Sequence, residues 1–366
     1  MTTFPFPVFA QEFARRTAIE RVLGIEVSTP RQADDPVAAA VRHGLNRFPK
    51  TLPPWLFYDR TGSKLFDEIT GRPEYYLTRT ERGILTDHAE SMIDRAAGSA
   101  RLRITELGAG SADKTRLLLK AAVARQGQVT YEPLDVSASA LEQAKHGIER
   151  DIPEVTVRPR VTDYTRENHL DATRKLHLAQ NRNSERGVEF EQLHPGERRL
   201  VLYIGSSIGN FEPHEAKRLL RRVRAGLSKG DGLLLGVDRV KDRRILLAAY
   251  DDFAGVTADF NLNMLARLNR ELGAEFLLDG FEHRAVWNEA ESRIEMHLES
   301  RVAQKIRIAA LKMEVEFAQG ETIHTECSYK YKPGQAEAIL CEAGFAECES
   351  WTDERGWFNV CLAKVD

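Results

Sequence analysis

Between residues 101 and 237, short apolar runs alternate with longer amphipathic stretches, and this rhythm constrains the fold more than any other feature of the chain. It predicts strands at 101–106, 129–134, 155–160, 200–204 and 232–237, and helices at 114–124, 138–150 and 214–227. Strands that alternate with helices in this way favour a parallel sheet with right-handed crossover connections. The sequence therefore predicts an α/β fold for this part of the chain.

A glycine-rich turn joins the first predicted strand to the first predicted helix. It reads Glu106-Leu-Gly108-Ala-Gly110-Ser-Ala-Asp113-Lys114. Glycines let the backbone turn sharply and approach a ligand closely. A dinucleotide-binding fingerprint would place a third glycine where Asp113 stands, so a nicotinamide-dependent oxidoreductase is disfavoured. An ordinary strand-to-helix turn stays open as an alternative.

Polar residues also follow the next two strands. Asp135 ends the strand VTYEPLD, where a carboxylate can accept hydrogen bonds from both hydroxyls of a ribose. Asp135 could instead cap the following helix, although Ser137 competes for that place. Asp163 and Tyr164 follow the third strand, where an acid and an aromatic ring could hold the amino edge and the face of an adenine. Because ligands of open α/β sheets bind at the carboxyl ends of the strands, we expect one shared site.

The fourth strand ends in a second glycine-containing segment, YIGSSIGNFEP. Gly205 and Asn210 lie at the carboxyl end of this strand, which faces the substrate in this architecture. Asn210 could equally be the N-cap of a nearby helix.

Two further regions follow a different pattern. Residues 49–76 are rich in aromatic and turn residues, which suits either rings packed on a neighbouring domain or the wall of a pocket. Residues 242–271 read as largely helical, and strand-like segments follow at 285–287, 293–298 and 305–307. The tail reads as a helix, a strand, a turn at 353–356 and a final strand. At roughly 100–200 residues per domain, a chain of 366 residues accommodates two domains.

Composition and local motifs disfavour several classes of protein. Lys and Arg number 52 against 55 Asp and Glu, so no strongly basic face for nucleic acid is expected. No apolar run approaches the roughly 18–20 residues of a membrane-spanning helix, and residues 1–16 lack the pattern of a secretory signal. Neither C-x-x-C nor H-E-x-x-H spacing occurs, so we expect no metal site and no disulfide framework. The expectation is a soluble cytoplasmic protein that acts as a monomer.

Several segments together resemble the histidine-specific S-adenosylmethionine-dependent methyltransferases. In order they are FYDRTGSKLFDEITGRPEYYLTRTE, ELGAGSADKT, IGSSIGNFEP, GDGLLLGVDRVKD, AAYDDFAGVTADFN, RIEMHL and TECSYKY, with Asp135 at its strand end. The resemblance implies a class I, Rossmann-like methyltransferase α/β domain with a second, smaller α+β substrate-binding domain. The first domain would comprise residues 79–239 and 331–366, and the second residues 28–78 and 240–330. Residues 1–27 would be an N-terminal extension, and residues 165–199 a surface insertion.

The resemblance also implies an activity and a set of contacts. The activity would be methyl transfer from S-adenosylmethionine to the α-amine of free L-histidine, repeated to the trimethylated betaine hercynine, the first step of ergothioneine biosynthesis. Cofactor contacts would be Gly108, Lys114, Asp135, Asp163 and Tyr164. Substrate contacts would be Tyr75, Gly205, Asn210, Tyr250, Thr257, Met296, Glu326, Cys327 and Ser328. Tyr58, a water molecule or exchange with bulk solvent would take up the proton of the amine.

The chemistry of these side chains agrees with the implied roles. Asn210 and the Tyr250 hydroxyl can donate hydrogen bonds to a carboxylate, and Glu326 can accept one from an imidazole N–H while Ser328 adapts to the other nitrogen. Related family members methylate tryptophan derivatives, whose indole ring needs no carboxylate at position 326. Two alternatives stay open: methylation of another amino acid such as a tryptophan derivative, or binding of S-adenosylmethionine without catalysis.

Overall fold

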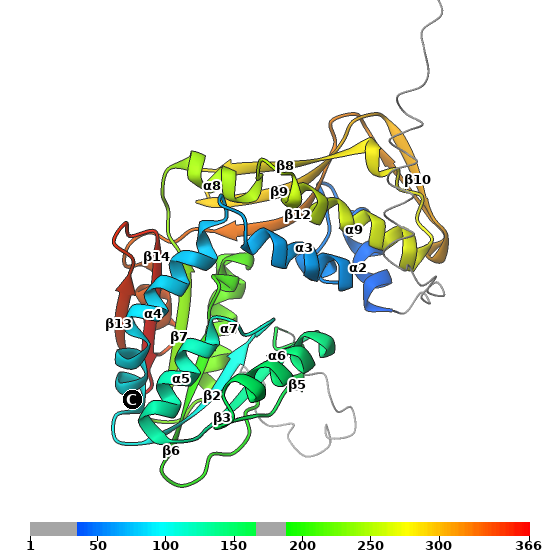
Figure 1. Ribbon diagram of the computed structural model, residues 1–366. Coiled ribbons are helices and arrows are strands. Elements are labelled where there is room, and N and C mark those ends of the chain that lie inside the picture. The colour runs from blue at the N-terminus through cyan, green and yellow to red at the C-terminus, as the bar shows by residue number, and fades with distance from the viewer. Residues whose placement is uncertain (1–34, 166–187) are drawn as a thin grey trace, which may run out of the picture.

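The computed structural model describes residues 35–165 and 188–366, which form two lobes with separate sheets (Figure 1). The extension predicted at 1–27 and most of the insertion predicted at 165–199 lie outside the described residues. The domain boundaries given above stay a prediction.

The larger lobe is built on an eight-stranded sheet. Its strands are β2 (Arg101–Leu107), β3 (Val129–Asp135), β4 (Val155–Val157), β5 (Arg160–Val161), β6 (Glu197–Tyr203), β7 (Gly232–Asp238), β13 (Glu347–Thr352) and β14 (Phe358–Lys364). Their order is β13-β14-β7-β6-β2-β3-β4, with β5 also paired to β3. The strands from β7 to β4 run parallel, whereas β14 is antiparallel to both β7 and β13. The predicted parallel sheet is confirmed, and the predicted tail strands close one edge of it.

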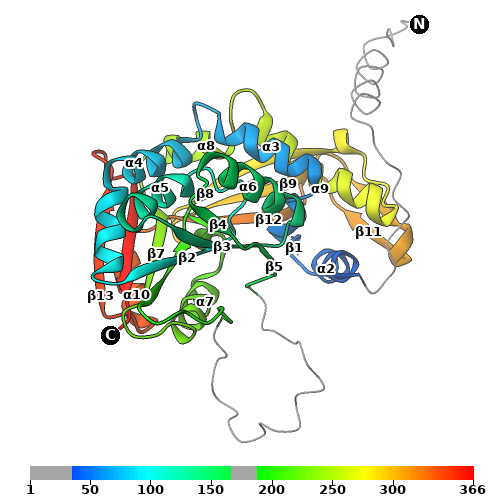
Figure 2. The ribbon, with the colours of Figure 1, turned by 60° about the horizontal axis from the view of Figure 1, so that its bottom comes forward.

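Helices cover both faces of this sheet (Figure 2). On one face lie α4 (Tyr76–Ala97), α5 (Thr115–Gln126) and α6 (Ala138–Asp151), and on the other α7 (Pro213–Ala225) and α10 (Gln335–Glu342). Local signals place the helix starts: the Ser137 side chain accepts a hydrogen bond from the Ala140 N–H, and Glu212 and Glu215 form a capping box around Pro213. The result is a three-layer sandwich with a core on each side of the sheet.

The smaller lobe holds a four-stranded sheet and a two-stranded one. The first has the order β1 (Lys50–Thr51), β12 (Thr322–Tyr329), β9 (Arg293–Ser300), β8 (Phe281–Asn288), and the second pairs β10 (Gln304–Ile308) with β11 (Met313–Phe317). Its helices are α2 (Pro36–Leu45), α3 (Arg60–Thr70), α8 (Arg243–Tyr250) and α9 (Val256–Leu272), with short 3-10 turns η1 (Pro54–Phe57), η3 (Leu278–Gly280) and η4 (Ala309–Leu311). Alternate residues of β9 are buried against α8 and α9, as expected for a strand with one face on a core.

The elements differ from the predicted ones in several places. The strand predicted at 155–160 is interrupted by Pro159, which has no N–H for the ladder, so β4 and β5 are separate. The strand β6 begins at Glu197, inside the predicted surface insertion, and Arg199 is buried. The long helix α4 and the strand β12 were not predicted as elements.

Candidate functional site

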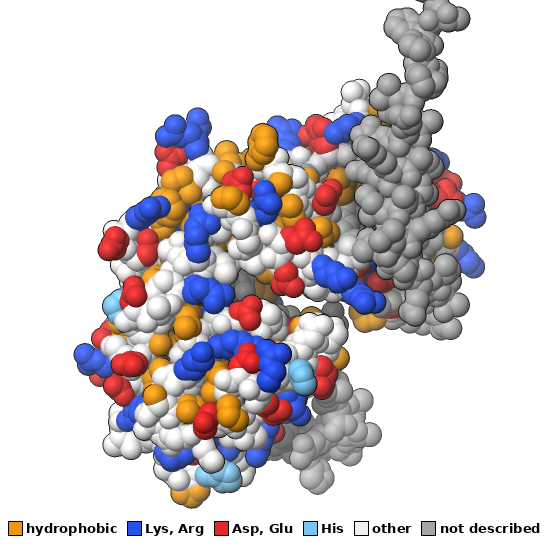
Figure 3. All heavy atoms as spheres, in the orientation of Figure 1, with side chains coloured by type: hydrophobic (Ala, Val, Ile, Leu, Met, Phe, Trp, Pro, Cys, Tyr) orange, Lys and Arg blue, Asp and Glu red, His pale blue; other side chains and the backbone are white. Residues whose placement is uncertain are grey.

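The carboxyl ends of β2, β3 and β6 face the smaller lobe, and the space-filling view shows a hollow between the two lobes (Figure 3). The turn after β2 begins with Gly108, whose φ of 69° lies in the region that favours glycine, and its N–H donates to the Leu134 carbonyl over 2.8 Å. A Cβ at Gly108 would lie 2.8 Å from the Tyr164 hydroxyl oxygen. The glycine therefore keeps a space open beside Tyr164.

Asp135 links two of these loops. Its carboxylate accepts hydrogen bonds from the Gly110 N–H over 3.1 Å and from the Ser137 N–H over 2.9 Å. Because the Ser137 side chain is the N-cap of α6, the capping alternative for Asp135 is wrong. Asp135 is only half-buried, so it can still accept hydrogen bonds from a ligand.

Asp163 and Tyr164 lie after β5 in the same region. The Tyr164 ring packs edge-on against Tyr203 of β6, with 6.0 Å between the ring centroids. Burial raises the pKa of Tyr164, so its hydroxyl is protonated at neutral pH. Asp163 accepts a hydrogen bond from the Thr165 N–H over 3.0 Å.

Lys114 is held by a buried carboxylate that sequence reasoning missed. The Glu81 side chain, fully buried on α4, forms an ion pair with the Lys114 ammonium and accepts a hydrogen bond from the Gly205 N–H over 2.8 Å. A Cβ at Gly236 of β7 would lie 2.2 Å from the Glu81 carboxylate, so this glycine makes room for it. The one available signal was that Glu81 ends the first segment of the family resemblance.

The wall of the site on the smaller lobe centres on a pair of hydroxyls. The Tyr250 and Ser328 hydroxyl oxygens lie 2.7 Å apart, and the Lys330 ammonium donates to both, over 2.8 and 2.9 Å. The same ammonium lies 2.9 Å from the Asp238 carboxylate, and both of these charged side chains are fully buried. Although burial opposes it, Lys330 and Lys241 hold the pKa of Asp238 below its ordinary value. Lys330 and Asp238 were not predicted as site residues.

This arrangement limits the hydrogen bonds that the two hydroxyls can offer. Lys330 uses its three N–H bonds on Asp238, Tyr250 and Ser328. One hydroxyl must donate to the other, because their oxygens are within hydrogen-bond distance. A single hydroxyl proton, from Tyr250 or from Ser328, is therefore left for a bound molecule.

Glu326 lies on the same strand as Ser328 and pairs with Met296 of β9 in the sheet register. Burial raises the pKa of Glu326 to about 7, against the opposing charge of Lys330. The carboxyl group is thus poised to exist in both protonation states near neutral pH. Beside it, Met296 is buried and supplies an apolar surface.

Two further predicted residues, Tyr75 and Tyr58, make ring contacts within the smaller lobe. The Tyr75 ring lies edge-on to Tyr250, with centroids 6.4 Å apart. Tyr58 is 39% exposed and packs its ring against Phe260, with centroids 5.9 Å apart. Although part of its surface is exposed, desolvation by the surrounding protein, then Glu326 and Tyr75, and then Asp135 on the other lobe, raise the pKa of Tyr58 well above its ordinary value. Carboxylates of both sets of predicted residues therefore act on the Tyr58 hydroxyl.

A family model described as histidine-specific methyltransferase, SAM-dependent, matches residues 37–365. The chain belongs to this family. It is 45% identical over 323 residues to a histidine N-alpha-methyltransferase of Mycolicibacterium smegmatis, covering 88% of this chain and 93% of that protein. A protein of the same name from Mycobacterium tuberculosis is 40% identical over the same shares. Ergothioneine biosynthesis protein 1 of Neurospora crassa is 28% identical over 96% of this chain and 36% of that protein.

The family resemblance stated from sequence is thus confirmed: the chain is a methyltransferase with an α/β domain built on a mostly parallel sheet, and S-adenosylmethionine is its cofactor. The residues of the cleft fit this cofactor. The space in front of Gly108, which a Cβ would fill, and the half-buried carboxylate of Asp135 both face the same strand ends. No helix in the described ranges is long and apolar enough to cross a membrane.

Two other predicted substrate contacts of this methyltransferase, Asn210 and Thr257, lie on different elements. Asn210 ends the short 3-10 turn η2 (Ser207–Asn210), which packs so closely on β12 that a Cβ at Gly209 would lie 2.8 Å from the Tyr329 carbonyl oxygen. Thr257 is buried near the start of α9, where its N–H donates to Asp252 over 2.7 Å.

Cys327 differs from its neighbours on β12. Its thiol lies 3.4 Å from a ring nitrogen of His324 and faces away from the hydroxyl pair, because successive residues of a strand point to opposite sides. The thiol of Cys327 therefore does not face the cleft, and the expected contribution of Cys327 to the substrate site is limited to its backbone.

Proposed function

We propose that this methyltransferase transfers methyl groups from S-adenosylmethionine to the α-amine of free L-histidine, in succession, to give the trimethylated betaine hercynine. This would be the first step of ergothioneine biosynthesis. The relatives named above support the substrate, and one observation in the cleft carries the proposal furthest. The Glu326 carboxyl stands beside a hydroxyl pair held by Lys330, which suits a small ligand with an N–H donor and a nearby acceptor.

The cofactor would be held at the edge of the larger sheet. When bound, S-adenosylmethionine supplies an electrophilic methyl group on its sulfonium. We assign Asp135 to the ribose hydroxyls and Asp163 with Tyr164 to the adenine, with the open space at Gly108 admitting the cofactor. Lys114 would attract the carboxylate of the cofactor, in competition with its ion pair to Glu81.

The substrate would be held mainly by the smaller lobe. We assign Asn210 and Tyr250 to its carboxylate, and Glu326 with Ser328 to the imidazole, which Met296 would line. The hydroxyl proton that remains on the Tyr250–Ser328 pair then forms a hydrogen bond with one of two acceptors, the substrate carboxylate or the imidazole nitrogen that carries no proton. Neighbouring residues would bind the other acceptor. Tyr75, Gly205 and Thr257 would complete the enclosure.

The amine must lose a proton before it can attack the methyl group. We place Tyr58 between the proposed cofactor and substrate positions. Its raised pKa disfavours the phenolate, so it is a poor base at neutral pH. A neutral phenol can still accept a hydrogen bond from the amine N–H and so orient the nitrogen lone pair. We assign Tyr58 this positioning role and leave proton uptake to water.

Incubation of the full chain with S-adenosylmethionine and a panel of free amino acids tests the proposal. Mass spectrometry should show one, two and then three methyl groups added to histidine, and fragmentation should place them on the α-nitrogen. Methylation of a tryptophan derivative instead would favour the alternative substrate, and binding of the cofactor without any methylated product would favour a non-catalytic protein. Action as a monomer in the cytoplasm stays a prediction.

A further inference from the structure

A second polar cluster lies on the opposite side of β9 and β12 from Met296, Glu326 and Ser328. It consists of Glu295, His297, His324 and Cys327, contributed by two adjacent antiparallel strands. The sheet register places His297 directly opposite His324 and Glu295 directly opposite Cys327. The proposed methyl transfer uses none of these four side chains.

The spacing of three of these side chains is close to that of metal ligands, and Cys327 contacts one of the three. One ligand atom each of Glu295, His297 and His324 lies within 4.8 Å of the other two. The Glu295 carboxylate is 3.2 Å from His297 Nε2, and the Cys327 thiol is 3.4 Å from His324 Nε2. Around a tetrahedral Zn²⁺ the ligand atoms are separated by roughly 3.3 Å for oxygen and nitrogen and roughly 3.6 Å for nitrogen and sulfur. Two edges of such a tetrahedron are thus present already.

The two imidazoles lie close together, and His324 Nε2 also lies 3.0 Å from the Glu326 carbonyl oxygen, a contact that a bound ion would replace. Their rings are stacked with centroids 4.9 Å apart. The Nδ1 atom of His297 is buried and has no hydrogen-bond partner among the described residues. With an ion on Nε2, this Nδ1 atom would carry the proton of the neutral ring.

The charges around the cluster permit a cation. Arg293 binds one oxygen of Glu295 over 2.8 Å, while the other oxygen is turned toward His297. The positive charge of Arg293 is offset by Glu212, which it also contacts over 2.8 Å. A divalent ion at the cluster would therefore meet the Glu295 carboxylate without an uncompensated cation beside it.

We propose that Glu295, His297 and His324, with Cys327 as the fourth ligand, bind a divalent transition metal of the zinc type. Imidazole, carboxylate and thiolate together favour Zn²⁺ over hard cations such as Mg²⁺ and Ca²⁺. The ion would displace the thiol proton of Cys327 and join β9 to β12 behind the register shift between His324 and Glu326. It would thus stabilise β12, the strand that carries Glu326 and Ser328.

Titration of the metal-free full chain with Zn²⁺ by calorimetry tests the proposal. We expect one ion per chain and at least tenfold weaker binding in H297A and in H324A. With Co²⁺ as the probe, the visible bands of a tetrahedral site should appear, and the near-ultraviolet band of a thiolate ligand should be lost in C327S. The titrations should use a C341S/C348S background, because these exposed thiols can bind metal themselves.

The matched control is H43A, which removes an exposed histidine of α2 in the same lobe and should leave the affinity unchanged. If H297A fails to fold, H324Q and the Co²⁺ spectrum of the parent chain still decide the matter. Absence of Zn²⁺ binding, or equal binding by the parent, H297A and H324A, would overturn the proposal. A chain that binds Zn²⁺ but does not methylate histidine would contradict only the proposed function.

Discussion

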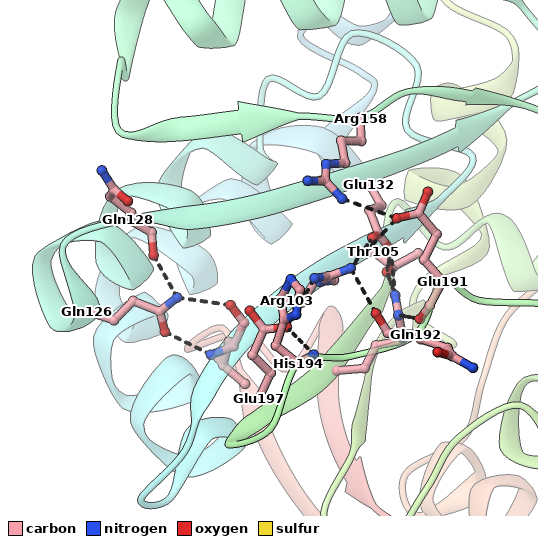
Figure 4. Close-up of polar contacts among 12 residues, drawn as sticks. Arg103, Thr105, Gln126, Gln128, Glu132, Arg158, Glu191, Gln192, His194 and Glu197 are labelled. Atoms are coloured by element: carbon pink, nitrogen blue, oxygen red, sulfur yellow. Dashed lines mark hydrogen bonds and ion pairs between the residues drawn. The ribbon is translucent and has the colours of Figure 1, made fainter.

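One buried ionic cluster lies within the larger lobe and another where the two lobes meet, and comparing them shows what distinguishes a structural cluster from a functional one. In the first, the Glu132 carboxylate accepts hydrogen bonds from Arg103 over 3.2 Å and Thr105 over 3.0 Å, and from Arg199 (Figure 4). In the second, the Asp238 carboxylate receives Lys330 over 2.9 Å and the Tyr76 hydroxyl over 2.7 Å. Burial and charge are much the same in both.

The two clusters differ in the other hydrogen-bond acceptors that Arg103 and Lys330 contact. Arg103 also binds Glu197 over 3.1 Å and the Gln192 carbonyl over 3.3 Å, so its outer hydrogen bonds are spent on the protein. Lys330 instead binds the hydroxyls of Tyr250 and Ser328, which stand beside Glu326 at the cleft. A buried ion pair is thus poor evidence of function by itself, whereas one that orders groups facing a cleft is better evidence.

The largest expected effect comes from removing the central cation of each cluster. K330M and R103M both leave a buried carboxylate short of a partner, so each should lower the free energy of unfolding by about 3–5 kcal/mol. Only K330M also removes two charge-assisted hydrogen bonds from the substrate wall, and its kcat/KM for histidine should fall about 100-fold or more. Activity per folded molecule, with the folded fraction measured by circular dichroism, separates the two. Equal loss in both variants would erase the distinction between the clusters.

The next largest effect is expected on substrate selectivity when the carboxylate of Glu326 is removed. An imidazole N–H facing Glu326 makes a charge-assisted hydrogen bond, whereas an indole would leave this carboxylate poorly paired at a cost of a few kcal/mol. In E326A the ratio of kcat/KM for histidine to that for tryptophan should therefore fall roughly 10- to 100-fold. E132Q is the matched control, since it should cost stability and leave the ratio unchanged. A ratio that stays constant in E326A would place selectivity elsewhere.

A smaller effect is expected at the two ends of the sheet. Asp135, at the carboxyl end of β3, and Asp231, just before β7, each accept two backbone N–H bonds. D135A should weaken the affinity for S-adenosylmethionine by about 1–3 kcal/mol, or roughly tenfold or more. D231A should destabilise the fold without changing that affinity. Calorimetric titration with the cofactor measures both, and an unchanged affinity in D135A would remove its ribose assignment.

The same comparison shows how far the sequence could predict the site. The cofactor edge was predictable because Gly108 and Asp135 stand at the ends of successive strands, which a parallel sheet brings together. The anchor of the substrate wall was not, because Asp238, Tyr250 and Lys330 come from β7, from α8 and from just beyond β12. Their contacts depend on how two sheets meet, and no local pattern encodes that.

Two further features depend on long-range contacts that local spacing does not encode. The search for local spacing predicted no metal site, whereas the cluster of Glu295, His297 and His324 exists only because β9 pairs with β12. Glu81 was missed because α4 was not predicted as a helix, so nothing pointed its carboxylate toward Lys114. Glu326 and Ser328 themselves were named only through the family resemblance.

The smallest expected effect is the dependence of stability on pH at Glu326. Burial raises the pKa of this carboxyl to about 7 in the folded chain, from an ordinary value of 4.5. The folded protein then holds the proton more tightly than the unfolded chain, so the free energy of unfolding falls as the pH rises from about 4.5 to about 7. We expect this decline to be about 1–3 kcal/mol, and to be missing in E326Q, which cannot titrate.

Urea unfolding of both proteins across this pH range measures the decline, with E90Q on the exposed side of α4 as the control for losing any carboxylate. Subtracting the E326Q curve from that of the parent removes the contributions of the other carboxyls, which the two proteins share. If the difference stays flat, Glu326 has the same pKa in the folded and the unfolded chain, and water in the cleft stabilises its charge. The carboxyl would then resemble an exposed acid, and the cleft would lose the property that separates Glu326 from the fully paired Glu132.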